Sequence, residues 1–216
     1  MRISHRVWLL ALLGLGLLLV GPPRARAVVG PGSCVTGTAV CLGNTGDVGK
    51  KSCNGDVACE DNSGRISNGA CIGVGACLDN SGSVKNTSCL GFSACDFNTA
   101  AVGTHSCLGF VACGANDGPI GNNACLGPVA CDSNDGVVGT SSCKGFGACN
   151  SNTAPVGTDS CNGTQACAGN SGTIGNNSCK GDQACCGNTA VIGNDQCNGA
   201  PIGGVGVCQV GGCGGT

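Results

Sequence analysis

The sequence predicts an all-β fold: a disulfide-stapled parallel β-solenoid (β-helix) with 18 residues per coil and about 9–10 coils. Three observations lead to this prediction. Cysteine recurs at a fixed interval, other residue types recur at the same interval, and the composition is unsuited to an ordinary globular core. The chain has 22 cysteines and 42 glycines, but only four phenylalanines and no tyrosine. Disulfides are therefore expected to stabilise the chain in place of large packed side chains.

Two cysteine columns run through the chain, each with a period of 18 residues. The first column comprises Cys53, Cys71, Cys89, Cys107, Cys125, Cys143, Cys161, Cys179 and Cys197. The second comprises Cys41, Cys59, Cys77, Cys95, Cys113, Cys131, Cys149, Cys167 and Cys185. The gaps alternate between six and twelve residues with no insertion. A repeat of constant length indicates that each unit forms one coil stacked on the next.

Other columns follow the same period, and the consensus of one unit is I-G-N-x-S-C-x-G-x-x-A-C-x-x-N-S-G-x. Val or Ile stands five residues before the first cysteine of each unit, and Gly stands two residues after it. Asn fills one column without exception. We expect its side chains to form a hydrogen-bonded ladder along the stack and to favour a turn. This Asn ladder comprises Asn44, Asn62, Asn80, Asn98, Asn116, Asn134, Asn152, Asn170 and Asn188.

Short strands fit this repeat better than helices. A unit of 18 residues would form one short helix, yet each unit carries several Gly together with Asn and Ser, which helices disfavour. Extended segments turned by Gly and Asn-Ser-Gly suit the composition. Identical columns would then stack about 4.8 Å apart along parallel ladders, and the coils would make a rod of roughly 45 Å.

Two known solenoid types share parts of this pattern. The segment Ile-Gly-Asn-Asn-Ser-Cys at 174–179 resembles the hexapeptide of left-handed β-helices, whose coils contain three such hexads. The next hexad, 180–185, keeps the Gly and the small residue but places Lys180 where an inward aliphatic residue is expected. The spacing of the two cysteines in a unit is similar to that of insect antifreeze solenoids, in which the pair crosses the coil interior. These resemblances cover residues 48–199, imply a solenoid fold and leave its handedness open.

Two disulfide pairings fit the cysteine spacing. The first joins the cysteines of one unit, from Cys53–Cys59 to Cys179–Cys185, with Cys34–Cys41 as an imperfect first member. The second joins neighbouring units, from Cys41–Cys53 to Cys185–Cys197. Both give the same number of pairs, so counting does not separate them. We prefer the first, because Cys34 then has a partner and the shorter loop matches the antifreeze resemblance. It leaves the set Cys186, Cys197, Cys208 and Cys213 to close a C-terminal cap.

The N-terminus has the pattern of a secretory signal peptide. Arg2 and Arg6 precede an apolar run at 8–20, and Ala25-Arg26-Ala27 offers a cleavage site. The expected organisation is a signal peptide at 1–27, an N-terminal cap and first partial coil at 28–47, the solenoid at 48–199 and a Gly/Cys-rich cap at 200–216. We therefore expect a secreted or cell-surface protein without a membrane span after cleavage, since dense cysteines behind an export signal indicate an oxidising compartment.

Charge and motifs argue against several functions. Cleavage would leave six basic and twelve acidic residues, a formal charge of −6, which disfavours nucleic-acid binding. We expect no catalytic residue, no cofactor and no metal. His105 stands alone in a variable column, and the cysteine spacing does not match a zinc site. Asp117 and Asp135 share a column, with Asp132 nearby, so a Ca²⁺ site or a glycosidase-like pair is the alternative to solvated surface acids.

The most informative surface feature is apolar. The columns one and three residues after the first cysteine are apolar in the middle units but hold residues such as Asp56 and Lys180 in the outer units, which predicts that they face outward. Residues two apart share a strand face, so an apolar stripe rimmed by polar residues is expected, and such a patch is typical of a contact surface. The alternative is that these columns turn inward in mid-rod. The stripe comprises Ile72, Val74, Leu90, Phe92, Leu108, Phe110, Leu126 and Phe146.

These features predict a secreted, non-enzymatic structural or adhesive repeat protein, whose partner is an extracellular surface or a second copy. Ice binding is the second hypothesis. It rests on the repeat architecture and on a column of Asn and Thr formed by Asn86, Thr104, Asn122, Thr140, Thr158, Asn176 and Asn194. A β-helical carbohydrate-active enzyme ranks last, because the units carry no long inserted loops that would form a cleft.

Overall fold

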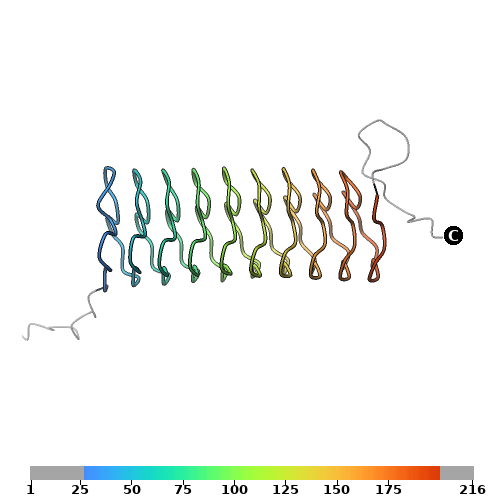
Figure 1. Ribbon diagram of the computed structural model, residues 1–216, viewed down its shortest axis with the longest axis horizontal. Helices are drawn as coiled ribbons and strands as arrows, with labels where there is room; N and C mark the ends of the chain where they lie inside the picture. Colours follow the sequence, from blue (N-terminus) through green and yellow to red (C-terminus); the bar gives the residue numbers. More distant parts are fainter. Residues whose placement is uncertain (1–26, 200–216) are drawn as a thin grey trace, which may run out of the picture.

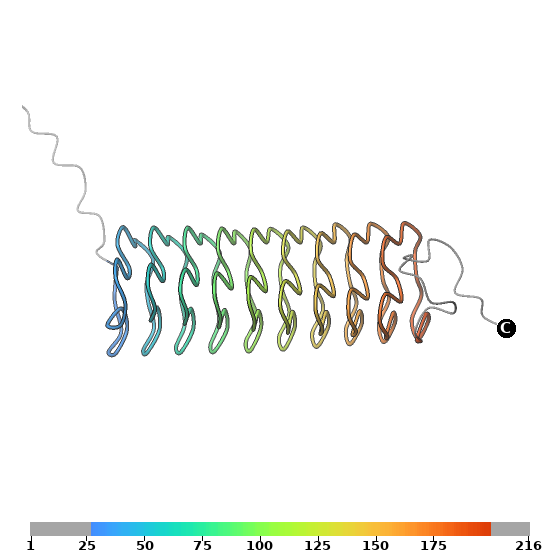
Figure 2. The same ribbon diagram turned by 90° about the horizontal axis from the view of Figure 1, so that it is seen from above.

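The computed structural model describes residues 27–199, which form one rod of stacked coils (Figure 1). We number the coils from the N-terminal end: coil 1 is 28–47, coils 2–9 are the 18-residue units from 48–65 to 174–191, and 192–199 begin coil 10. Seen from above, the coils follow one another at a regular spacing (Figure 2). The expected signal peptide, apart from Ala27, and the expected C-terminal cap at 200–216 lie outside the described residues.

The all-β prediction is wrong, because residues 27–199 contain no β-sheet and no strand longer than a single bridged residue; they contain no helix either. Isolated parallel bridges join adjacent coils along two series, one from Val29 to Ile192 and one from Asn54 to Lys144. At Ile66 the N–H donates to the Asp47 carbonyl (2.8 Å), and the Ile66 carbonyl accepts from the Gly49 N–H (2.7 Å). The rod is therefore a repeat solenoid with hydrogen-bonded coils, but it is not a β-helix.

Left-handed backbone conformations at recurring positions prevent the formation of longer strands. In coil 2, φ is 54° at Lys51, 53° at Cys53, 138° at Gly55, 50° at Val57 and 50° at Asp61. A strand requires φ near −120° to −140° at consecutive residues. Each bridge is therefore limited to a single residue in each coil. Residues other than Gly seldom adopt positive φ, and nothing in the sequence signals this conformation at Lys, Cys and Val.

The Gly column two residues after the first cysteine is required by the backbone. Its φ lies between 123° at Gly181 and 159° at Gly199, in a region that side chains with a Cβ rarely occupy. A Cβ on Gly91 would also lie 2.2 Å from the carbonyl oxygen of Gly109 in the next coil. Both the local conformation and the close approach of the coils thus select glycine.

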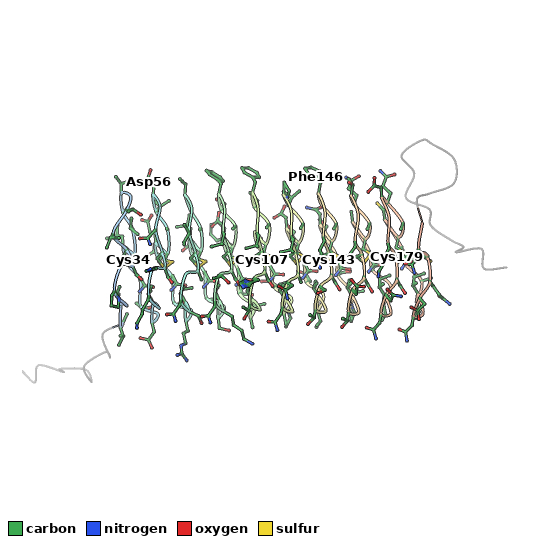
Figure 3. All side chains as sticks on the ribbon, in the orientation of Figure 1. Cys34, Asp56, Cys107, Cys143, Phe146 and Cys179 are labelled. Carbon is green, nitrogen blue, oxygen red and sulfur yellow. A yellow bond between two sulfur atoms is a disulfide. The ribbon has the colours of Figure 1, made fainter. Side chains whose placement is uncertain are left out.

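A ladder of nine disulfides runs along the rod, and each disulfide joins the two cysteines of one coil, from Cys34–Cys41 to Cys179–Cys185. This is the within-unit pairing, with Cα–Cα distances of 5.4 to 5.9 Å. The first-column cysteines lie in a row along the rod (Figure 3). Closing a loop of this length stabilises the fold by about 2 kcal/mol on the loop-entropy account. Cys186 and Cys197 are also disulfide-bonded.

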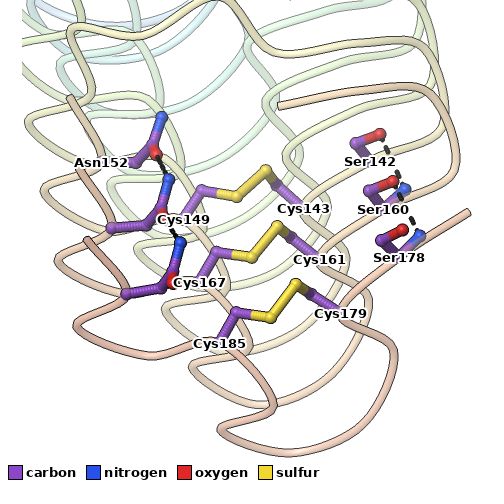
Figure 4. Close-up of a disulfide and its surroundings, with 12 residues drawn as sticks. Ser142, Cys143, Cys149, Asn152, Ser160, Cys161, Cys167, Ser178, Cys179 and Cys185 are labelled. Atoms are coloured by element: carbon purple, nitrogen blue, oxygen red, sulfur yellow. Dashed lines mark hydrogen bonds between the residues drawn. A yellow bond between two sulfur atoms is a disulfide. The ribbon is translucent and has the colours of Figure 1, made fainter. Parts of the chain in front are cut away.

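From Asn62 to Asn188 the Asn ladder is buried beside the disulfides (Figure 4). The Nδ2 of Asn116 donates to Asn98 Oδ1 in the preceding coil (2.8 Å) and to the Gly118 carbonyl in its own coil (2.8 Å). Its Oδ1 in turn accepts from Asn134 Nδ2 (2.9 Å). The same arrangement recurs from Asn44 to Asn188 with all amides oriented alike. Because each position needs two donors and one acceptor on a short side chain, Asn fits and Asp does not.

A column of buried serines lies on the other side of the disulfides, as Ser142, Ser160 and Ser178 illustrate (Figure 4). The Ser160 Oγ donates to the Gly175 carbonyl in the next coil (2.7 Å) and accepts from the Ser178 N–H (3.1 Å). Together with the Val/Ile column and the Ala that precedes the second cysteine, these polar ladders fill the interior. The core therefore consists of small and medium side chains, and the described phenylalanines lie outside it.

Replacing Ala70 or Ala124 by Ser is expected to stabilise the protein, because these two positions interrupt the serine column. Within the described residues, the Ser88 N–H and the Lys85 carbonyl have no hydrogen-bond partner, and the hydroxyl that Ala70→Ser introduces would supply both. We expect a gain of about 1 kcal/mol per site in the free energy of unfolding. Guanidinium denaturation without reductant measures it, and slower exchange of the Ser88 amide hydrogen localises it.

The matched control is Ala76→Ser, a substitution at a buried position where the neighbouring coils also carry Ala. An added hydroxyl there has no counterpart in the ladder and should destabilise the fold by about 1–3 kcal/mol. Equal effects of Ala70→Ser and Ala76→Ser would contradict the assignment.

Asn116→Asp is expected to lower the free energy of unfolding by about 3–5 kcal/mol at neutral pH. The change removes both donors to buried acceptors and introduces a buried carboxylate. Burial raises the folded-state pKa of this carboxyl above its unfolded value of about 3.9. The loss is therefore smallest below about pH 4, where both states are protonated, and grows as the pH rises towards the folded pKa. Denaturation across a pH series measures this.

Asn122→Asp is the control for the Asn ladder. Asn122 is exposed, and its Oδ1 only accepts the Thr104 N–H (2.9 Å), which a carboxylate also does. Its effect should stay within about 0.5 kcal/mol at every pH. A similar pH-dependent loss in both variants would refute the role of the buried amide donors.

Candidate functional site

The structure places the predicted apolar stripe on the surface. In its outer column, which lies three residues after the first cysteine, Val74 is 43%, Phe92 51%, Phe110 55% and Phe146 54% exposed. Pro128 continues the column and is also exposed. Phe146 lies on the same edge of the rod as Asp56, which belongs to this column (Figure 3). The columns therefore do not turn inward in mid-rod, which was the alternative interpretation.

The inner column of the stripe, one residue after the first cysteine, is mostly less exposed than the outer column. Ile72 is exposed, whereas Leu90, Leu108 and Leu126 are half-buried. These residues form the second bridge series, so their backbones are fixed from coil to coil. In the outer column the rings of Phe92 and Phe110 stack, with centroids 5.3 Å apart and an interplanar angle of 11°. The stripe is thus a row of apolar side chains at fixed spacing.

Polar and charged residues bound the stripe at both ends. At the N-terminal end, Asp56 Oδ1 accepts the Thr38 N–H (2.7 Å). At the C-terminal end, Asp182 Oδ1 accepts the Thr164 N–H in the same way (2.7 Å). The aspartates in this column therefore cap backbone groups of the preceding coil. Lys144 ends the apolar run of the inner column in coil 7. The stripe is consequently uncharged over coils 3–6 and flanked by charge.

The acidic residues considered from the sequence lie on the surface and form no site. Asp117 accepts a hydrogen bond from Thr99 Oγ1 (2.5 Å), and both Asp117 and Asp135 are exposed. Burial raises the pKa of the Asp132 carboxyl, while hydrogen bonds from the Asn150 side chain and the Ser133 N–H lower it. Within residues 27–199 no three carboxylate or histidine side chains come close enough to share a cation.

A second pair of acids lies near the stripe coils. Burial raises the pKa of the Asp96 carboxyl, the charge of Asp79 raises it further, and the Phe97 N–H lowers it. Asp96 Oδ1 is buried without a hydrogen-bond partner. Two acids alone do not form a cation site or a catalytic pair.

The remaining chemical candidates have structural explanations. His105 is exposed, and its Nδ1 lies 2.7 Å from Thr87 Oγ1 of the preceding coil. Groups of three cysteine sulfurs lie within 4.8 Å of one another, for example Cys71, Cys77 and Cys89. These sulfurs are joined in disulfides and are therefore not thiolate ligands.

The Asn/Thr column considered for ice binding also stabilises the rod. Asn122 Oδ1 accepts the Thr104 N–H (2.9 Å), and Asn176 Oδ1 accepts the Thr158 N–H (2.8 Å). The asparagines of this column thus cap the preceding coil, as the aspartates of the stripe column do. Most members of the column are exposed.

Sequence reasoning missed two sets of residues. The serines before the first cysteine were visible in the consensus, but only the structure shows that each hydroxyl links its own coil to the next. The aspartates that cap backbone N–H groups were visible only as charged residues at the stripe ends. In the described range there is also no helix of the length and apolarity that crossing a bilayer requires.

A hollow of about 390 Å³ lies at the N-terminal end, lined among others by Val28, Asp47, Arg65 and Asn86. Val28 N donates to Asp47 Oδ1 (3.0 Å), and the Val28 carbonyl accepts the Val48 N–H (2.8 Å). The first residue after the expected cleavage site is therefore held by Asp47 and Val48, where coil 1 passes into coil 2.

Comparison with known proteins supports a family but no function. A family described as a domain of unknown function (DUF7640) matches the chain over residues 32–127 and again over 112–215. No curated protein and no solved structure matches the chain. The two family matches together span most of the sequence, so the chain belongs to the DUF7640 family and is, within it, a cysteine-rich repeat solenoid held by stacked disulfides and an Asn ladder.

Proposed function

We propose that this protein is exported and acts outside the cytoplasm as a non-enzymatic structural rod that adheres to other surfaces through its apolar stripe. The observation that carries the proposal is the exposure of Val74, Phe92, Phe110 and Phe146 in one column of a rod whose interior is complete without them. Contiguous apolar patches rimmed by polar residues mark contact surfaces.

The energetics favour adhesion through the stripe. A phenylalanine side chain buries about 150–250 Å² when it is fully covered, so each half-exposed ring offers about 100 Å². Covering that area contributes up to about 2.5 kcal/mol per ring at 25 cal/mol per Å². The Phe92 and Phe110 rings already stack on each other, so little conformational entropy is lost when they make a contact.

Export is supported by the disulfides. The ladder requires an oxidising environment, and the N-terminal pattern of Arg2, Arg6 and the apolar run at 8–20 is that of a signal peptide. Cleavage before Val28 would convert the nitrogen that donates to Asp47 into a charged α-ammonium, and the hydrogen bond of 3.0 Å would become an ion pair.

The variant Phe92→Thr/Phe110→Thr/Phe146→Thr is expected to lose adsorption to an alkyl-terminated monolayer while its fold is kept. Thr stands in the same column in coil 8, as Thr164, so the coils accept it. Surface plasmon resonance on alkyl-terminated and hydroxyl-terminated monolayers measures adsorption. Circular dichroism and a non-reducing peptide map check the fold.

Phe97→Thr is the control, because Phe97 is 56% exposed but lies in another column. Adsorption that falls equally in both variants, or in neither, would refute a role for the stripe. Thermal hysteresis that survives in the triple variant would favour ice binding through the exposed Asn/Thr column instead.

When the full chain is expressed in a host with a secretory pathway, the exported protein is expected to begin at Val28. In it, Asp47→Asn should speed hydrogen exchange of the Val48 amide, which is bonded to the Val28 carbonyl, because the ion pair that holds Val28 is lost. The Val84 amide, bonded to the Arg65 carbonyl in mid-rod (2.8 Å), should be unaffected. Mass spectrometry reads both the terminus and the exchange; a retained leader would contradict the export proposal.

A further inference from the structure

We infer that the stripe binds a second copy of this chain, face to face and antiparallel, with the two-fold axis between Phe92 and Phe110. The inference rests on the proposed function and names the partner of that surface. Each coil presents the stripe columns once, so the ridges formed by Phe92, Phe110 and Phe146 repeat with the spacing of the coils. A second copy has the same spacing, so each coil of one copy can lie against one coil of the other along the stripe.

Apolar residues oppose apolar residues over coils 3–6 in this register. An axis between coils 4 and 5 sets coil 4 of one copy against coil 5 of the other, and coil 3 against coil 6. Ile72 and Val74 then face Leu126 and Pro128. An isologous contact of this kind closes on itself and gives a dimer rather than a fibre.

The charges that bound the stripe are complementary in the same register. Coil 2 faces coil 7, so that Asp56 lies opposite Phe146 in the outer column, and Lys144 lies beside Phe146 in the neighbouring inner column of that coil. Each dimer contains this opposition twice. Coil 1 faces coil 8, so that neutral polar residues, Thr38 and Thr164, oppose one another. The flexible four-carbon stem of lysine allows the ammonium to reach across from the inner column.

Other registers match less well. A parallel pair sets Asp56 against Asp56, Lys144 against Lys144 and Asp182 against Asp182, which is repulsive. An antiparallel pair centred on Phe110 sets coil 2 against coil 8, so that Asp56 faces Thr164 in a coil without a basic side chain, and it also sets Lys144 against Ile72. The order of charged, apolar and polar coils therefore selects the axis between Phe92 and Phe110.

The dimer is expected to be weak. The exposed parts of the three rings, Ile72 and Val74 amount to roughly 400 Å² per copy, about half of the ~800 Å² that a standard interface buries on each partner. Two ion pairs at the rim then have a measurable influence on the dissociation constant. This makes charge substitution a suitable probe.

Sedimentation equilibrium on the intact mature chain, in a concentration series that reaches the millimolar range, tests the inference. Asp56→Lys alone and Lys144→Asp alone should each raise the dimer dissociation constant about 5–20-fold, because each places like charges opposite one another twice. The double variant Asp56→Lys/Lys144→Asp should restore it to within about twofold. Added salt should weaken the parent dimer and strengthen the single variants.

Asp182→Lys is the matched control. Asp182 lies in the column of Asp56 and caps an equivalent backbone N–H, but coil 9 has no opposing coil in this register. It should leave the dissociation constant unchanged. An equal effect of Asp182→Lys, or single variants without rescue in the double variant, would overturn the antiparallel register.

The two proposals fail in different ways. A parent chain that stays monomeric at every concentration, while the triple Thr variant still loses adsorption to the alkyl monolayer, would overturn the dimer and leave adhesion standing. If the triple Thr variant both adsorbs and dimerises like the parent chain, the stripe has neither role.

Discussion

The narrow cross-section of the coil is the constraint on which the rest of the structure depends. The 18-residue coils of this rod enclose only small and medium side chains, and the interior is about one disulfide wide. The half-cystines from Cys53 to Cys179 are fully buried and span the space between the Asn and Ser columns. Disulfides perform the task of a hydrophobic core here, as they do in small domains that cannot bury enough apolar surface.

A narrow interior also means that buried polar groups find partners mainly in the adjacent coils. Asn116 bonds to Asn98 and Asn134, and Ser160 links to the coils on either side. An inserted residue inside a coil would move these side chains out of register and leave several buried groups unpaired. This explains the constant repeat length. A longer loop, Cys34–Cys41 with a separation of seven residues, lies in coil 1, the first coil of the described residues 27–199.

The sequence predicted what depends on register and missed what depends on backbone conformation. Equal spacing was enough to expect stacked coils, the Asn ladder and a contact column containing Phe92 and Phe110. The pairing of Cys53 with Cys59 needed a resemblance to another solenoid, because spacing alone allowed two schemes. The prediction of β-strands was wrong because residues such as Lys51 and Val57 adopt a left-handed backbone conformation. Residues of these types seldom adopt it, so the sequence did not indicate it. Val48 and Ile66 form a bridge, as β-branched residues often do, but their neighbours do not extend it.

The variation of the stripe column separates folding from function. Columns that the fold requires are nearly constant: Cys for the ladder, Asn for two donors and an acceptor, and Gly for positive φ. The outer stripe column instead holds varied residues, among them Thr38, Asp56, Val74, Pro128 and Thr164. The fold of the coil therefore does not require a particular side chain at this position. Water favours polar residues at such a position. The apolar side chains at this position in five consecutive coils, two of them stacked phenylalanines, are therefore not a consequence of folding. We propose that they reflect selection for contact with another surface.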